Sequence, residues 1–115
     1  MKFLLALIAL LGLGNAVASD LDFTLVNHTP RSFEAVYITA SDNKDWDGNL
    51  LPDGRPLVAG GKLAVKFDSH AKSASWDLNI VDSDGVSVTF DDVKLSGADT
   101  VTLKVVHGKI TAEVE

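Results

Sequence analysis

The sequence predicts an all-β protein, a single antiparallel β-sandwich of about seven strands with an immunoglobulin-like broad architecture, preceded by an N-terminal signal peptide. Three observations lead to this prediction. Apolar and polar residues alternate with a period of two in seven short runs, which is typical of strands with one buried face. Turn-forming Gly and Asp residues separate several of these runs, and no stretch after residue 18 has the 3.6-residue apolar period of a helix.

The first eighteen residues have the layout of a secretory signal peptide. Lys2 gives a short basic start, residues 3–14 form an unbroken apolar run, and residues 16–18 (AVA) fit the small-residue cleavage pattern. The run of about twelve residues is shorter than the roughly 20 that a membrane-spanning helix needs. We therefore expect a signal peptide over 1–18 and one β-sandwich domain over 19–115, exported to the periplasm or secreted.

The expected strands have apolar side chains at every second position, so that one face of each is buried. The first two, FTLVN and EAVYIT, also contain the β-branched and aromatic residues that favour strands. In chain order the seven strands are expected over residues 23–27, 34–39, 62–68, 75–81, 86–90, 100–107 and 109–114. For the last five, the residues expected in the core are Leu63, Val65, Phe67, Trp76, Leu78, Ile80, Val86, Val88, Phe90, Val101, Leu103, Val105, Ile110, Ala112 and Val114.

Turn-forming residues separate several of these expected strands. Asp82-Ser83-Asp84-Gly85 joins two alternating runs as a tight hairpin in which Gly85 suits a positive φ. Residues 107–109 (HGK) are typical of a second hairpin, residues 60–61 (GG) precede the third strand, and residues 96–99 (SGAD) form a polar turn before the sixth.

Charge and composition exclude several classes of function. Removal of Lys2 with the signal peptide takes the formal net charge from −6 to −7, which disfavours nucleic acid and anionic membrane surfaces as partners. The chain contains no Cys, which excludes thiol catalysis, Cys-ligated metals and structural disulfides. Ser19 stands where a lipoprotein would carry its lipidated Cys, so we expect no membrane anchoring after cleavage.

One connection is long for a compact domain, and it is where we expect a contact surface. Residues 40–60 link the second and third strands over about twenty residues, and connections of that length are often functional. The loop carries Trp46, Asp47 and Asn49, which together with Tyr37 are the candidate binding residues for an unknown protein or small ligand. Two roles stay open for Trp46: packing on the adjacent leucines at 50–51, or exposure as an anchor for a partner.

The same loop suggests a calcium-dependent binding module as an alternative. Asn43, Asp45, Asp47 and Gly48 follow the N-x-D-x-D-G pattern that begins a calcium-binding loop, with oxygen ligands at alternate positions. The position where a bidentate Glu would close the site holds Gly54. A polar surface loop whose carboxylates accept backbone N–H groups explains the same residues without an ion.

A small periplasmic hydrolase is a further alternative, with little in the sequence to favour it. No nucleophile motif is present, the three His are far apart in the sequence, and a domain of this size offers little depth for a water-excluding site. We therefore expect no catalytic residues. Asn27-His28-Thr29 also matches the acceptor sequence for N-glycosylation in hosts that glycosylate exported proteins.

Several runs taken together resemble a family of small exported proteins of unknown role, found mainly in bacteria. They are VYIT at 36–39, WDGNLL at 46–51 and WDLNIVDSDG at 76–85, within a stretch of similar order over residues 22–103. The resemblance implies a compact β domain behind a signal peptide and implies no activity. That family often has Gly after the loop Trp, where this chain has Asp47, so the resemblance implies no calcium site.

Overall fold

The computed structural model describes residues 19–43, 45–68 and 71–115, which fold into two packed β-sheets. The expected signal peptide over 1–18 lies outside the described residues. The strands are β1 (Phe23–His28), β2 (Phe33–Ala40), β3 (Lys62–Val65), β4 (Trp76–Asp82), β5 (Ser87–Val93), β6 (Thr100–Val106) and β7 (Lys109–Val114). The predicted all-β sandwich with seven strands is confirmed. The described residues contain no helix able to cross a membrane.

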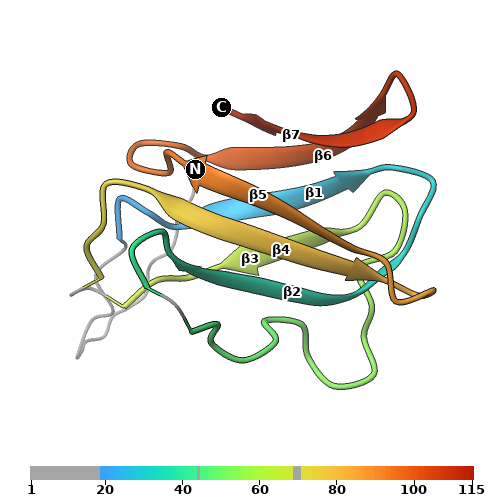
Figure 1. The fold of residues 1–115 in the computed structure, drawn as a ribbon, viewed down its shortest axis with the longest axis horizontal. Coiled ribbons are helices and arrows are strands. Elements are labelled where there is room, and N and C mark those ends of the chain that lie inside the picture. The colour runs from blue at the N-terminus through green and yellow to red at the C-terminus, as the bar shows by residue number, and fades with distance from the viewer. Residues whose placement is uncertain (1–18, 44, 69–70) are drawn as a thin grey trace, which may run out of the picture.

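The two sheets contain four and three strands, in the orders β3-β1-β6-β7 and β2-β4-β5. In Figure 1 the three-stranded sheet lies in front, and β6 and β7 extend beyond β5 at the top. Four of the five strand pairings are antiparallel, and β1 pairs with β6 in parallel. The sequence did not predict this parallel pairing, because alternation reports which face of a strand is buried and does not report its neighbour.

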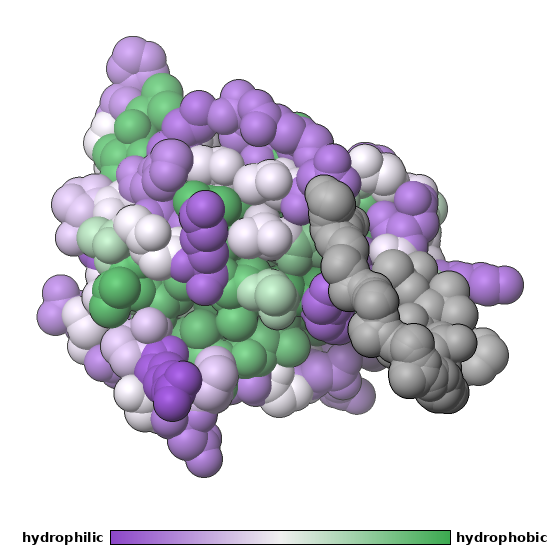
Figure 2. Space-filling view, turned by 180° about the vertical axis from the view of Figure 1, so that it is seen from behind, coloured by the Kyte–Doolittle hydropathy of each residue, from purple (hydrophilic) through white to green (hydrophobic). Residues whose placement is uncertain are grey.

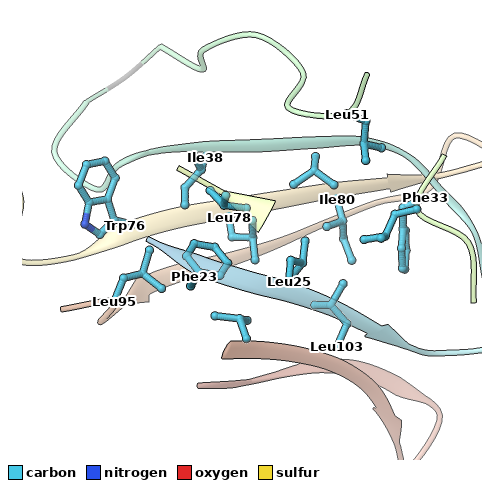
Figure 3. Packing of buried hydrophobic residues seen from close by; sticks show 14 of the residues in the cluster. Phe23, Leu25, Phe33, Ile38, Leu51, Trp76, Leu78, Ile80, Leu95 and Leu103 are labelled. Atoms are coloured by element: carbon cyan, nitrogen blue, oxygen red, sulfur yellow. The ribbon is translucent and has the colours of Figure 1, made fainter. Parts of the chain in front are cut away.

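The core lies between the sheets, where the alternating apolar residues of both meet (Figure 3). Trp76, Leu78 and Ile80 of β4 all point into it, as their spacing predicts. Trp76 also packs edge-on against Phe67, with ring centroids 4.8 Å apart. The most deeply buried apolar side chains are Phe33, Leu25, Leu78, Ile80, Leu95, Leu103, Val36 and Val101.

Three valines expected in the core are exposed instead. Val86 is 50 % exposed because β5 begins at Ser87, one residue later than expected, so Val86 belongs to the preceding turn. Val105 and Val114 are 42 % and 39 % exposed. Both lie on the inner face of the β6–β7 hairpin, which reaches beyond the cover of β5 (Figure 1).

Both predicted hairpins form. Between β4 and β5, one carboxylate oxygen of Asp82 accepts the backbone N–H groups of Asp84 and Val86 at 2.9 Å each, and Gly85 has a φ of 82°. Between β6 and β7, His107 and Gly108 have φ values of 53° and 78°. Two successive positive φ angles define the type I′ turn that suits the twist of a two-residue hairpin.

Candidate functional site

The connection between β2 and β3, residues 41–61, follows the edge of β2, and we call it the binding loop (Figure 1). Leu57 forms an isolated bridge with Phe33, exchanging backbone hydrogen bonds of 2.8 and 3.0 Å. Leu51 and Leu57 are 8 % and 3 % exposed and belong to the core. The base of the binding loop is therefore an ordered part of the sandwich.

Asn49 fastens the middle of the loop to the edge of β2. Its side-chain oxygen accepts the N–H of Val36 at 2.9 Å and that of Leu51 at 3.1 Å, and its amide donates to the carbonyl of Glu34 at 3.1 Å. The N–H of Leu50 adds a 2.8 Å bond to the carbonyl of Val36. These bonds use the candidate binding residue Asn49 to cover unpaired backbone groups of an edge strand, which favours a structural role for its amide.

Asn43 and Asp45 fasten the first part of the loop. The Thr39 hydroxyl donates to the carbonyl of Asp45 at 3.0 Å and accepts the Asn43 amide at 3.0 Å. The side-chain oxygen of Asn43 accepts the N–H of Asp45 at 3.2 Å. This last bond is a side-chain turn of the kind that Asn commonly forms in loops.

The residues considered as calcium ligands have the following places in this arrangement. One of them, Asn43, already uses its oxygen on the backbone, while Asp45 and Asp47 are exposed. Within residues 19–43, 45–68 and 71–115, no three His, Cys, Asp or Glu side chains gather in a geometry suited to a metal ion. No observation on the described residues favours the calcium module or the hydrolase.

Residues 42–43 and 45–48 of the loop are all exposed, and we call them its tip; among them Trp46 is 43 % exposed. The leucines considered as its packing partners belong to the core region: Leu51 is buried in the core, and Leu50 is partly buried against it. Asp47 beside it is exposed. Of the two roles open for Trp46, its exposure favours that of an anchor for a partner.

Tyr37 lies on β2 and is half-buried. It alternates with Val36 and Ile38, which point into the core, so its ring is on the outer face of the three-stranded sheet. In the register it stands opposite Asn79, whose amide binds the hydroxyls of β5. Tyr37 is thus placed by the sheet, whereas the other three candidate residues are placed by the binding loop.

Asn27 fixes the far end of the binding loop, a role that sequence reasoning missed. It is 0 % exposed, and its amide donates to the carbonyls of Leu57 at 3.0 Å and Arg31 at 2.7 Å. Its oxygen accepts the N–H of Thr29 at 3.0 Å and the Thr29 hydroxyl at 2.7 Å. Its backbone exchanges bonds with the glycines at 60–61. The apparent glycosylation acceptor is therefore buried with both amide hydrogens in use.

An ion pair secures the turn beside Asn27. Arg31 binds Asp82 at 3.0 Å, and the Asp82 side chain is only 5 % exposed. The N–H groups of Val86 and Asp84 and the Arg31 guanidinium lower the pKa of the Asp82 carboxyl below its ordinary value, although burial opposes this shift. The ionised Asp82 thus ties the β1–β2 turn to the β4–β5 hairpin.

No protein-family model and no curated protein matches the chain. A similar fold is found in the NMR structure of a protein from Eubacterium rectale, with a TM-score of 0.58 and 16 % sequence identity. The match covers 81 % of this chain and 85 % of that one. At this identity the likeness supports the fold alone, because one fold serves many functions. The resemblance to exported bacterial proteins stays a prediction.

Proposed function

We propose that this protein is an exported, non-catalytic binding module that contacts its partner through the tip of the binding loop. The observation that carries the proposal is the exposure of Trp46 on a loop with an ordered base. The exposed part of a large side chain supplies apolar area to an interface, and Trp is enriched among the residues that dominate binding.

The base of the loop supports this role by limiting the cost of binding. Bonds from Thr39, Asn49 and Leu57 hold the loop on both sides of its tip. A contact residue on an ordered base loses little conformational entropy when it binds, so more of the interface energy appears as affinity. The scaffold and the contact residue are thus separate parts of one loop.

The charge of the tip indicates the kind of partner. Asp42, Asp45 and Asp47 are all exposed around Trp46, and the chain as a whole is acidic. Carboxylates close to an aromatic ring suit a partner surface that presents Lys or Arg, through ion pairs and cation–π contacts. We therefore expect a basic protein segment as the partner, held by a salt-sensitive interaction.

Capture from an extract tests this proposal. The immobilised protein should retain a partner from the periplasm or medium of its source organism at low salt and release it at high salt. Trp46→Ala should lose the partner and keep the same thermal unfolding midpoint. Val86→Ala is the matched control, because Val86 is 50 % exposed in a turn outside the binding loop, and it should retain the partner.

A spectroscopic readout distinguishes direct contact from an indirect effect. The chain has two Trp, so Trp76→Phe leaves Trp46 as the single indole reporter. Its emission should shift to shorter wavelength when the captured partner is added, because the ring leaves water. An unshifted emission with the partner bound, or capture by Trp46→Ala equal to that of the unchanged protein, would contradict the role of the tip.

A further inference from the structure

Each sheet has two edge strands, and the described chain protects three of the four edges. The binding loop covers β2 through Asn49, and β3 is only four residues long with Lys62 at its start. In β5 a register shift at Asp91 and Asp92 breaks the ladder, and Asp92 has a positive φ of 56°. A cover, a short strand with Lys, and a charged bulge are the recognised means of preventing edge-to-edge pairing.

The fourth edge, β7, also starts with a Lys, but it is longer than β3 and has neither a covering loop nor a bulge among the described residues. It runs from Lys109 to Val114 in unbroken register with β6 and contains no Pro. Thr100 and Glu115 exchange both backbone bonds, at 3.1 and 2.9 Å. Because such pairs alternate along an antiparallel ladder, the N–H and C=O groups of residues 110, 112 and 114 point to the open side of β7.

The inner face beside this edge is apolar and incompletely covered. Val105 and Val114 are 42 % and 39 % exposed, and Ile110 and Ala112 are partly buried against the core. Figure 1 shows the cause, since β7 lies beyond β5. Figure 2 shows the outer face of the four-stranded sheet from behind. Apolar and near-neutral residues lie in its middle, and hydrophilic residues surround them.

We propose that β7 pairs antiparallel with β7 of a second copy of this chain, joining two four-stranded sheets into one. Charge complementarity favours a second copy of this chain as the partner of β7. A two-fold pair centred on Thr111 sets Lys109 of each copy opposite Glu113 of the other on the exposed face, where the Glu113 carboxylate also binds Lys104 of its own chain. The same register sets Ile110 opposite Ala112, whose backbone groups both point to the open edge.

Pairing with another edge of a second copy fits less well. An acidic stretch at 91–92 lies near the end of β5, and the Asp92 N–H is already bonded to the Asp77 carboxylate at 3.1 Å. Like charges then meet where this stretch lies beside Glu113 of β7. The β7 pair instead closes on itself and leaves no free β7 edge for a third copy.

A charge-swap experiment tests the pairing. Across a concentration series, the mass measured by sedimentation equilibrium should double for the unchanged protein. Lys109→Glu alone sets Glu against Glu and should stay at monomer mass, and Glu113→Lys alone sets Lys against Lys with the same result. Mixing the two variants restores both ion pairs, so the doubled mass should return. Lys66→Glu, an equal charge change near β3, is the control that should still pair.

Each result decides the proposal. Doubling lost in both single variants and restored in the mixture supports β7 pairing, because a merely structural effect would not be rescued by mixing. Three results would overturn it: a mass that stays monomeric at every concentration, single variants that still pair, or a mass that rises beyond twofold through open-ended pairing. Unchanged circular dichroism of both variants confirms that the exposed substitutions leave the fold intact.

Discussion

Replacing Asn27 by Ala should destabilise the protein more than its position near the end of β1 would suggest. Asn27 is fully buried and joins three segments, the β1–β2 turn at Thr29 and Arg31, the binding loop at Leu57, and β1 itself. Ala removes the amide and puts nothing polar in its place. The carbonyls of Arg31 and Leu57 and the N–H and hydroxyl of Thr29 then lose the Asn27 side chain as a hydrogen-bond partner.

The magnitude follows from the bonds. The side chain makes four, two donated to carbonyls and two accepted from Thr29. At roughly 0.5–1.5 kcal/mol for each net bond, their loss lowers the free energy of unfolding by about 4 kcal/mol. That is a large share of the roughly 5–15 kcal/mol that stabilises a typical domain.

Urea unfolding followed by circular dichroism measures this loss. With a slope of about 2 kcal/mol per M, the midpoint should fall by about 2 M. Asn79→Ala is the matched control, because the Asn79 amide also donates to three acceptors, the hydroxyls of Ser87 and Thr89 and the carbonyl of Val88. These lie on the half-exposed outer face, where water replaces a lost bond, so the control should lose no more than about 0.5–1 kcal/mol.

The comparison between the two variants is the decisive result. If Asn27→Ala and Asn79→Ala lower the midpoint by the same small amount, the buried network does not hold the binding loop, and our account of its ordered base is wrong. A midpoint shift accompanied by a smaller slope would point instead to a change in the unfolded ensemble.

Two further predictions concern the same framework. Asp82→Asn should destabilise the protein at neutral pH. The folded-state pKa of Asp82 lies below its ordinary value of 3.8, so the ionised carboxylate stabilises the fold above pH 3.8. This stabilisation is lost as the pH falls through the lowered pKa. The melting points of the two proteins should therefore converge in acid, and a constant difference would argue against stabilisation by the ionised Asp82 carboxylate, which the Val86 N–H, the Asp84 N–H and Arg31 bind. Gly61→Ala should cost about 1–3 kcal/mol, since a Cβ would meet the Val58 carbonyl at 2.9 Å. Gly48→Ala, in open space with no positive φ, should be neutral or add about 0.4–1 kcal/mol, and equal melting points of these two variants would contradict the close approach.

The strands were predictable because their chemistry is local. Alternation placed Trp76, Leu78 and Ile80 on one buried face, and the turn residues bounded each run. The exposure of Val105 and Val114 was not predictable in this way, since it depends on how far one sheet overlaps the other. The parallel β1–β6 pairing is also non-local and has no counterpart in a single run of residues.

For the candidate site, the sequence indicated the segment, and the structural roles of its single residues were harder to predict. Loop length and an isolated Trp marked the binding loop, and Trp46 is exposed on it. The role of Asn49 was not readable, because an Asn that caps a strand edge and an Asn that binds a ligand look alike in sequence. Asn27 was hidden for the opposite reason: its acceptor pattern suggested a surface position, whereas its four bonds lie in the interior.

The length of the binding loop has a structural cause, and this limits the part of the loop that needs a functional explanation. A sandwich has two open sides, and this loop closes one of them. The loop follows the edge of β2, forms the bridge at Leu57, and then bonds to the backbone of Asn27 before β3 begins. Most of residues 49–61 is therefore needed to cover strand edges whose unpaired backbone groups could otherwise pair with another chain. Only the tip around Trp46 has no such task. On the other side of the sandwich no loop of the described chain covers the edge of β7, and Val105 and Val114 are exposed there, which is why we propose pairing at this edge and not at β2.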